Sequence, residues 1–210
     1  MVLRSIVASL VLAAGLVTAP AAAYPVRGGD GFSVGASARC TIGASVAGGY
    51  VIAGDCATTG STVRGFNGVV QGTVMGTSFP GSSSGWVRVN SSWTPRGVVS
   101  NGAGGEVRVT GTQPAPIGAA VCRSGSQTGW HCGTITRRNV TVTFPQGSLH
   151  GLIETNICAE PGDKGAPLMA GGHLQGILVG GTGNCSTGGR SYYQPIIPIL
   201  QRYGLTLLSG

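Results

Sequence analysis

One segment, CAEPGDKGAP at residues 158–167, surrounds the amine of Lys164 with small and turn-forming residues. Gly162, Gly165 and Pro167 favour a tight turn in which successive backbone N–H groups can face inward and hold an oxyanion. A lysine at this position cannot form an acyl-enzyme of the serine type. The segment therefore predicts a tight turn that presents backbone N–H groups and an amine, and no hydroxyl, at its centre.

The elements that would position this turn are expected to be strands. Short apolar or alternating runs recur between glycine-rich turns, which is typical of an all-β chain. Pro114 and Pro116 mark a linker between two strand-rich halves. Residues 195–203 form the one segment that reads as helical, because Pro stands at its start and Gly204 just past its end. We expect a first small barrel over about 24–115, a second over about 116–195, and a short C-terminal helix.

Residues 1–23 have the organisation of a secretory signal peptide. Arg4 precedes an apolar run at 6–17, and three alanines at 21–23 come before the expected cleavage at Tyr24. The run is shorter than the roughly 20 residues that span a bilayer, and no later stretch is long or apolar enough to do so. We expect a secreted, monomeric protein whose folded domain covers residues 24–210.

Composition excludes two broad classes of protein. Only 9% of the residues are charged and 41% are hydrophobic, which is unlike a disordered, charge-rich chain. Without Arg4, 12 basic and 6 acidic side chains leave a net charge of +6, but the basic residues are scattered. We therefore expect a cationic soluble surface and no nucleic-acid binding.

Six cysteines in an exported chain predict three disulfides, for which 15 connectivities are formally possible. Two pairs are close in sequence across plausible hairpins, and the remaining two cysteines complete the set. The favoured pairs are Cys40–Cys56, Cys122–Cys132 and Cys158–Cys185. No CxxC motif or histidine cluster is present, so we expect no metal site and no cofactor.

Three segments together carry a family resemblance: VCRSGSQTGWHCGTI at 121–135, TNICAEPGD at 155–163 and GGTGNCSTGG at 180–189. With the cysteine spacing and the two-barrel pattern, the chain resembles the bacterial chymotrypsin-like serine proteases of the streptogrisin and α-lytic protease type. The resemblance covers essentially the whole mature chain. It implies a double Greek-key β-barrel with the active cleft between the two barrels.

Such a protease needs a nucleophilic Ser, a His that takes its proton and a buried Asp that orients the His. By local context, the His position falls in AGDC at 53–56 and holds Asp55. The Asp position follows Phe-Pro-Gly in the segment 79–84 and holds Ser83, while the Ser position holds Lys164. The resemblance therefore implies that all three catalytic positions are substituted.

The same resemblance assigns roles to the surroundings. The backbone of Gly162 and Lys164 corresponds to the oxyanion hole, and Arg123 with Asp163 corresponds to a buried ion pair that maintains the loop. The pocket for a substrate side chain would be walled by Ala159, Glu160, Pro161, Val179, Gly180 and Gly181. An extended peptide could add as a strand to the edge at the two glycines.

Across the cleft, the resemblance places Asp55 opposite Lys164. A short acid facing a long amine keeps roughly the combined reach of His and Ser. We expect the ammonium to lie within about 4 Å of the carboxylate or to reach it through one water.

The function that follows is a secreted pseudoprotease that binds without cleaving. Its candidate partners are extended peptides, protease inhibitors or a cell-surface partner. One alternative is a serine-type endopeptidase with residual or unconventional hydrolysis, for example with Lys164 as base and Ser83 as nucleophile. Another is a cationic wall-associated adhesive protein.

The resemblance implies a long pro-segment, and we expect none between the signal peptide and the domain.

Overall fold

A computed structural model describes residues 23–35 and 38–210, and the expected signal peptide lies outside these residues except for its last one. The described part contains sixteen strands and one helix. They are β1 Tyr24–Gly28, β2 Gly31–Val34, β3 Ala38–Thr41, β4 Ala44–Val46, β5 Gly49–Ile52, β6 Thr62–Arg64, β7 Val70–Ser78, β8 Ser84–Val89, β9 Trp93–Ser100, β10 Glu106–Arg108, β11 Ala120–Gly125, β12 Gly129–Phe144, β13 Gly147–Thr155, β14 Pro167–Ala170, β15 His173–Asn184, β16 Gly188–Pro195 and α1 Ile196–Tyr203.

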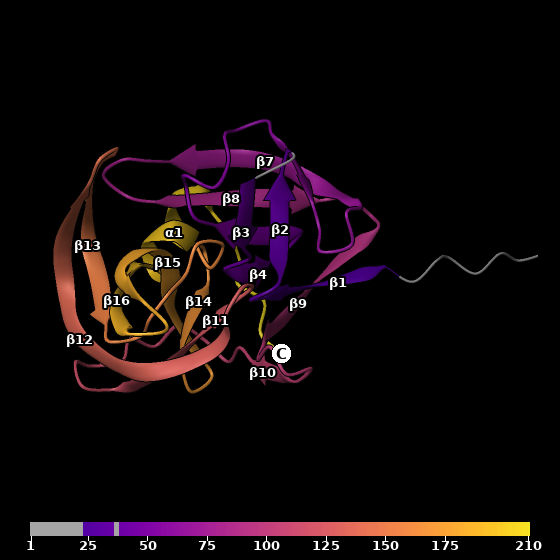
Figure 1. Cartoon of the computed structure of the whole chain (residues 1–210). Helices are drawn as coiled ribbons and strands as arrows, with labels where there is room; N and C mark the ends of the chain where they lie inside the picture. Colours follow the sequence, from indigo (N-terminus) through magenta and orange to yellow (C-terminus); the bar gives the residue numbers. More distant parts are fainter. Residues whose placement is uncertain (1–22, 36–37) are drawn as a thin grey trace, which may run out of the picture.

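The strands form two barrel-like assemblies, which Figure 1 shows side by side. In the first half a seven-stranded antiparallel sheet runs β3-β2-β6-β7-β8-β5-β4, and β9 lies between β1 and β10 in a smaller sheet. The second half is a closed barrel in the order β11-β12-β13-β16-β15-β14. The expected all-β fold with two barrel-like sheets and a short C-terminal helix is confirmed.

The apolar core joins the two halves. All four residues of β5 are buried, because β4 and β8 pair with it on its two sides and the main cluster of apolar side chains contains its Tyr50, Val51 and Ile52. The largest cluster of buried side chains contains Ile52 and Val99 from the first half together with Leu174 and Ile177 from β15. A second cluster fills the closed barrel. Because the main cluster takes side chains from both halves, the cleft between them has a packed floor.

The helix α1 fastens the end of the chain onto the first half. Pro195 precedes it, and Gly204 ends it in the left-handed conformation at φ 61°. Ile199 is buried against the main cluster, and the Tyr203 hydroxyl donates to the Ser84 carbonyl of β8 at 3.1 Å. This contact ties the C-terminal helix to the strand that begins next to Ser83.

Two glycines let the loops of the candidate site approach other backbone. A Cβ on Gly54 would lie 2.1 Å from the Ser78 carbonyl oxygen. A Cβ on Gly165, whose φ is +95°, would lie 2.1 Å from the Thr41 carbonyl oxygen. Each glycine adjoins a candidate residue, Asp55 or Lys164. Close packing of backbone on backbone therefore positions both side chains.

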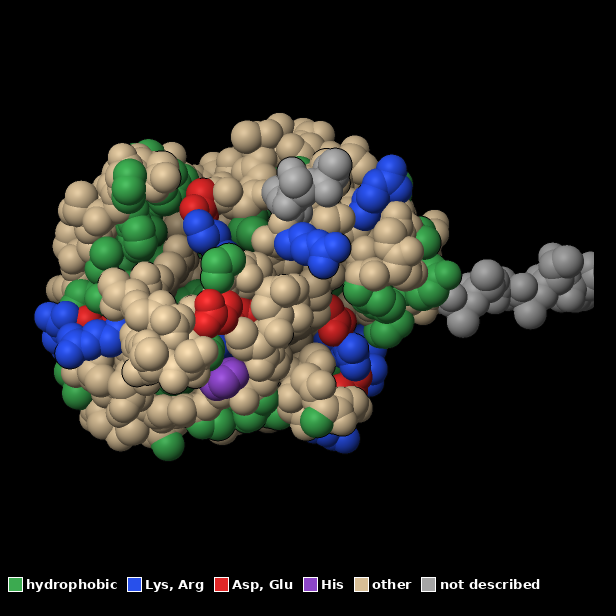
Figure 2. Space-filling view, in the orientation of Figure 1, with side chains coloured by type: hydrophobic (Ala, Val, Ile, Leu, Met, Phe, Trp, Pro, Cys, Tyr) green, Lys and Arg blue, Asp and Glu red, His purple; other side chains and the backbone are tan. Residues whose placement is uncertain are grey.

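The three disulfides are the expected ones, Cys40–Cys56, Cys122–Cys132 and Cys158–Cys185. Among the described residues, no helix has the length and apolar character needed to cross a membrane. The face shown in Figure 2 carries scattered basic side chains on a mostly uncharged surface.

Candidate functional site

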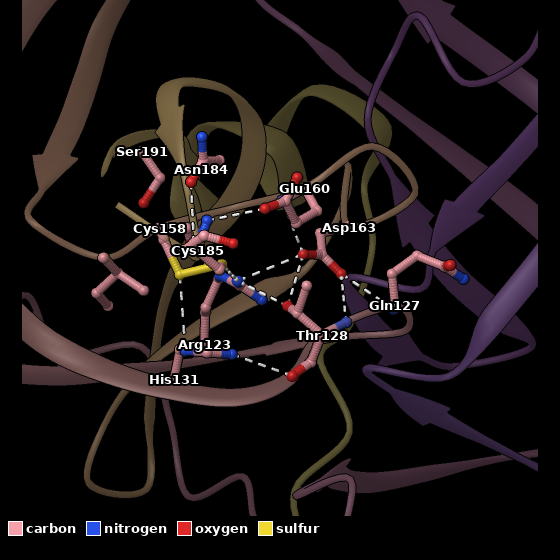
Figure 3. The surroundings of a disulfide bond; sticks show 12 residues. Arg123, Gln127, Thr128, His131, Cys158, Glu160, Asp163, Asn184, Cys185 and Ser191 are labelled. Carbon is pink, nitrogen blue, oxygen red and sulfur yellow. Dashed lines mark hydrogen bonds and ion pairs between the residues drawn. A yellow bond between two sulfur atoms is a disulfide. The ribbon is translucent and has the colours of Figure 1, made fainter. Parts of the chain in front are cut away.

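A buried ion pair holds the loop that carries Lys164. Nη2 of Arg123 lies 3.3 Å from Oδ2 of Asp163, and both side chains are fully buried. Figure 3 shows Asp163 surrounded by hydrogen-bond donors, which are the N–H groups of Gln127, Thr128 and Glu160 and the Thr128 hydroxyl. Arg123 in turn donates through Nε to the Cys158 carbonyl at 2.7 Å. These bonds compensate most of the buried charge, with only Nη1 of Arg123 lacking a partner among the described residues, and none of them depends on the side chain at position 164.

A second ion pair crosses the cleft. Asp55 follows β5 and Lys164 precedes β14, so the two residues come from different halves of the molecule. Nζ of Lys164 pairs with Oδ2 of Asp55, as expected from the sequence. Both side chains remain partly exposed, 37% for Lys164 and 28% for Asp55. The pair therefore bridges the two halves at the mouth of the cleft.

Ser83 lies beneath this bridge and is fully buried. Its hydroxyl donates to Oδ1 of Asp55 at 3.3 Å and accepts from the Gly54 N–H at 3.0 Å. Its own N–H donates to the side chain of Gln194 at 3.1 Å. The hydroxyl proton is thus directed at a carboxylate that Lys164 also neutralises. This arrangement orients Asp55 and leaves the serine inaccessible from the cleft.

Each of the three histidines is engaged away from the cleft. His131 Nε2 lies 3.1 Å from the Thr128 carbonyl, and His150 Nδ1 lies 3.1 Å from the Thr141 hydroxyl. His173 Nδ1 accepts the Gln113 N–H at 3.3 Å. None of them lines the cleft formed by the described residues. The imidazole that a serine nucleophile would need as general base is therefore missing from this site.

The backbone of the loop offers unused donors. The Asp163 carbonyl accepts the Ala166 N–H at 2.8 Å, and the peptide to Lys164 is trans. In a trans peptide the N–H points opposite the carbonyl, so the Lys164 N–H is directed away from that turn. Within residues 23–35 and 38–210, neither this N–H nor that of Gly162 donates to a protein group. Both residues line the cleft.

The cleft has a volume of about 530 Å³. From the expected pocket wall it contains Ala159, Glu160, Pro161, Gly180 and Gly181. Val179 is not part of it, which corrects the expectation from the sequence. That side chain is 3% exposed and packs with Leu149 and Leu152. Leu178, Gly180 and Gly181 line the cleft, and a register shift in the pairing of β15 with β16 lies between Leu178 and Gly180.

Sequence reasoning also missed Arg39. This exposed residue lines the cleft beside the Cys40–Cys56 disulfide. The signal was available, because Cys56 follows Asp55 and its partner Cys40 follows Arg39. The disulfide therefore brings Arg39 to the same side of the cleft as Asp55.

One cluster has ligand atoms close enough to hold a metal. Within the described part of the chain, His131, Cys158 and Cys185 place their ligand atoms within 4.8 Å of one another. The two sulfur atoms are bonded to each other in a disulfide, and the other cysteines are paired as well. The thiolates that zinc binding requires are absent, so the cluster does not fit a metal in this oxidation state.

Comparison with known proteins places this geometry in a family. The family model described as Trypsin matches residues 50–202, which include all of the cleft loops after β5. The chain belongs to the trypsin family. Streptogrisin-C of Streptomyces griseus is 47% identical over 195 residues, which cover 91% of this chain, and streptogrisin-A of the same organism is 38% identical over 188 residues, which cover 87%. This trypsin-family chain spans 43% of the length of the first relative and 61% of the second.

Solved structures of the trypsin family agree with the fold. The crystal structure of Cellulomonas bogoriensis chymotrypsin superposes with a TM-score of 0.85 at 48% identity and covers 89% of this chain and 100% of its own. Thermobifida fusca protease A gives 0.83 at 44% identity, with 89% of this chain and 100% of its own covered.

Proposed function

We propose that this trypsin-family protein is secreted and binds extended peptides or protein segments in its cleft without hydrolysing them. The observation that carries the proposal is the ion pair of Lys164 with Asp55 across the cleft. By the sequence resemblance, these two residues stand at the positions of the nucleophile and the general base. Ser83, at the third position, is uncharged and buried. A hydroxyl nucleophile with an adjacent general base is what the site lacks.

The binding half of the proposal is supported by the open edge of β15. β14 pairs with β15 from Pro167 to Ala170, opposite residues 173–177, so that side of β15 is free of β14 beyond Ile177. The free stretch includes Gly180 and Gly181, which line the cleft. An added peptide strand can form main-chain hydrogen bonds to such an edge while its side chains enter the adjoining pocket.

The test of inactivity uses a fluorophosphonate probe and a panel of fluorogenic peptides on the purified protein. We expect no covalent labelling and no turnover. The matched comparison is the triple variant Asp55→His, Ser83→Asp, Lys164→Ser, which asks whether the scaffold can still support labelling. Turnover by the unaltered protein that Lys164→Ala abolishes would overturn the proposal.

A second candidate is peptide hydrolysis by an unconventional route, which is favoured by the similarity to proteins named as proteases. Its chemistry would require Lys164 as a free base and Ser83 as an accessible nucleophile. The ion pair with Asp55 and the burial of Ser83 both oppose it. Loss of turnover in Ser83→Ala, with the fold intact, would select this candidate.

A further inference from the structure

The side chain of Lys164 is only partly used by its ion pair. An ammonium group has three N–H donors, and Asp55 is its one carboxylate partner among the described residues. The Lys164 side chain is 37% exposed at the cleft mouth. The remaining donors can therefore reach a ligand without breaking the bridge to Asp55.

The unused backbone donors lie in the same cleft. The N–H groups of Gly162 and Lys164 have no protein acceptor in the ranges that the structure covers, and both residues line the cavity. Backbone N–H groups that lose contact with water are nearly always paired with another acceptor. An acceptor supplied by a ligand would satisfy them. With the ammonium, they form a set of donors that suits one oxygen-rich anionic group.

The approach to these donors runs along β15. The Gly165 N–H donates to the Leu178 carbonyl at 2.8 Å, so the loop of Lys164 is attached to β15 at the point where its open edge begins. A peptide added at Gly180 and Gly181 therefore meets the loop at one end. The side chain of Lys164 crosses the cleft there and stands in the way of a chain that continues.

We propose that the cleft captures the free C-terminal carboxylate of an extended peptide, with the Lys164 ammonium and the N–H groups of Gly162 and Lys164 as its donors. This inference rests on the peptide binding proposed above and names the ligand class, which is peptides with a free α-carboxylate such as peptide-bond hydrolysis leaves. Backbone donors combined with a cation are a known solution for binding a carboxylate.

The other charged residues of the cleft weaken or strengthen the binding of a carboxylate. Asp55 competes for Lys164, and Glu160 opposes an anion, although one of its oxygens accepts the Cys185 N–H at 2.8 Å. Arg39, on the same side of the cleft as Asp55, contributes a second positive charge to its lining. Capture by Lys164 therefore makes different predictions from general attraction by the cleft as a whole.

The experiment uses a library of N-acetylated hexapeptides synthesised in two forms, free acid and C-terminal carboxamide. Peptides retained by the immobilised protein are identified by mass spectrometry, and their affinities are measured by fluorescence titration. We expect the acid to bind at least about 10-fold more tightly than its amide, the size expected of a charge-assisted hydrogen bond. A third arm, an amide that ends in Asp, separates an α-carboxylate from an acidic side chain.

Variants locate the effect. Lys164→Gln is expected to bring the ratio of the affinity for the acid to the affinity for the amide close to one. Asp55→Asn is expected to raise this ratio, because the carboxylate that competes for Lys164 is removed. Arg39→Gln removes the same charge from the same cleft and is expected to leave the ratio nearly unchanged. Lys164→Met repeats the test without a polar side chain, and circular dichroism verifies the fold of every variant.

The outcomes separate the two proposals. If acid and amide bind equally, carboxylate capture is wrong and peptide binding stands. If the amide ending in Asp binds as tightly as the acid, the site recognises acidic side chains and the α-carboxylate inference is wrong. If Arg39→Gln lowers the ratio as much as Lys164→Gln, general electrostatics explains the preference. If no peptide of either form binds, the proposed binding function fails as well.

Discussion

Asp163 and Lys164 are neighbours in the chain, yet their ion pairs lie in opposite environments. The pair of Asp163 with Arg123 is fully buried, whereas the pair of Lys164 with Asp55 is about one-third exposed. Water screens the second pair but cannot replace a missing partner in the first. Asp163 therefore stabilises the loop, whereas Lys164 determines the charge and the contacts at the mouth of the cleft.

Removing one partner from each pair should have unequal effects on stability. We expect Asp163→Asn to lower the free energy of unfolding by about 3–5 kcal/mol, because Arg123 stays buried with its charge uncompensated. We expect Asp55→Asn to change it by less than about 1 kcal/mol, because Lys164 remains partly hydrated. Urea denaturation monitored by tryptophan fluorescence measures both. Equal losses would contradict the distinction.

The environment of Glu154 should make the free energy of unfolding depend on pH. The guanidinium of Arg137 hydrogen-bonds to its nearly buried carboxylate and lowers the pKa of Glu154 below its usual value near 4.5. A lowered acid pKa stabilises the folded state above the unfolded pKa, and that stability is lost as the pH falls through the folded value. We expect Glu154→Gln to be less stable than the parent at pH 7, and the difference in stability to shrink as the pH falls below the unfolded pKa near 4.5.

That prediction is measured by urea denaturation at intervals from pH 7 to 3. Arg137→Gln removes the largest cause of the shift, and its difference in stability from the parent should shrink in the same way as the pH falls. A constant difference between parent and Glu154→Gln across this range would show that the carboxylate does not titrate differently in the two states.

At the scale of elements, the site is built by loops that strands and the helix hold in place. β5 delivers Asp55, β14 follows Lys164, and β15 provides the open edge. α1 reinforces β8 through Tyr203 and fills the main core with Ile199. The short helix therefore supports the segment next to Ser83 although it contributes nothing to the cleft lining among the described residues.

Truncation on α1 tests this support. We expect Ile199→Ala to cost about 2–5 kcal/mol of unfolding free energy, because it leaves a cavity in the main core. Gln201→Ala on the exposed side of the same helix is the control and should cost less than about 0.5 kcal/mol. Thermal and urea unfolding measure both variants. A small effect of Ile199→Ala would mean that the helix packs loosely on the sheet.

At the scale of the whole molecule, disulfides join segments that the chain separates. Their partners are 10, 16 and 27 residues apart. Cys158–Cys185 closes the longest loop and also connects the two walls of the candidate pocket. Closing a longer loop removes more conformational entropy from the unfolded chain.

Replacing the disulfide with the shortest loop and the disulfide with the longest loop by pairs of serines should therefore destabilise the protein to different extents. The loop-entropy relation gives about 2.7 kcal/mol for Cys122–Cys132 and about 3.6 kcal/mol for Cys158–Cys185. Urea denaturation of the two double variants measures the difference. The reverse order would show that contacts of the folded state, and not the unfolded chain, decide the contribution.

Much of the fold was predictable because it depends on local patterns. Alternating runs between glycine turns predicted an all-β chain, and the proline and glycine at its ends predicted α1 almost to the residue. Close spacing favoured two disulfides. Val179 was placed wrongly because the direction of a side chain depends on strand register, and a register shift lies between Leu178 and Gly180 of β15.

The sequence by itself determined which chemical groups the cleft could contain, since residue types are fixed before folding: an acid, a serine and a lysine stand where the family resemblance implies a catalytic triad. Only the tertiary structure decided how these groups are used. Pairing of Asp55 with Lys164 and burial of Ser83 are contacts between distant segments. Their energies depend on distance and on exclusion of water, which no local pattern specifies.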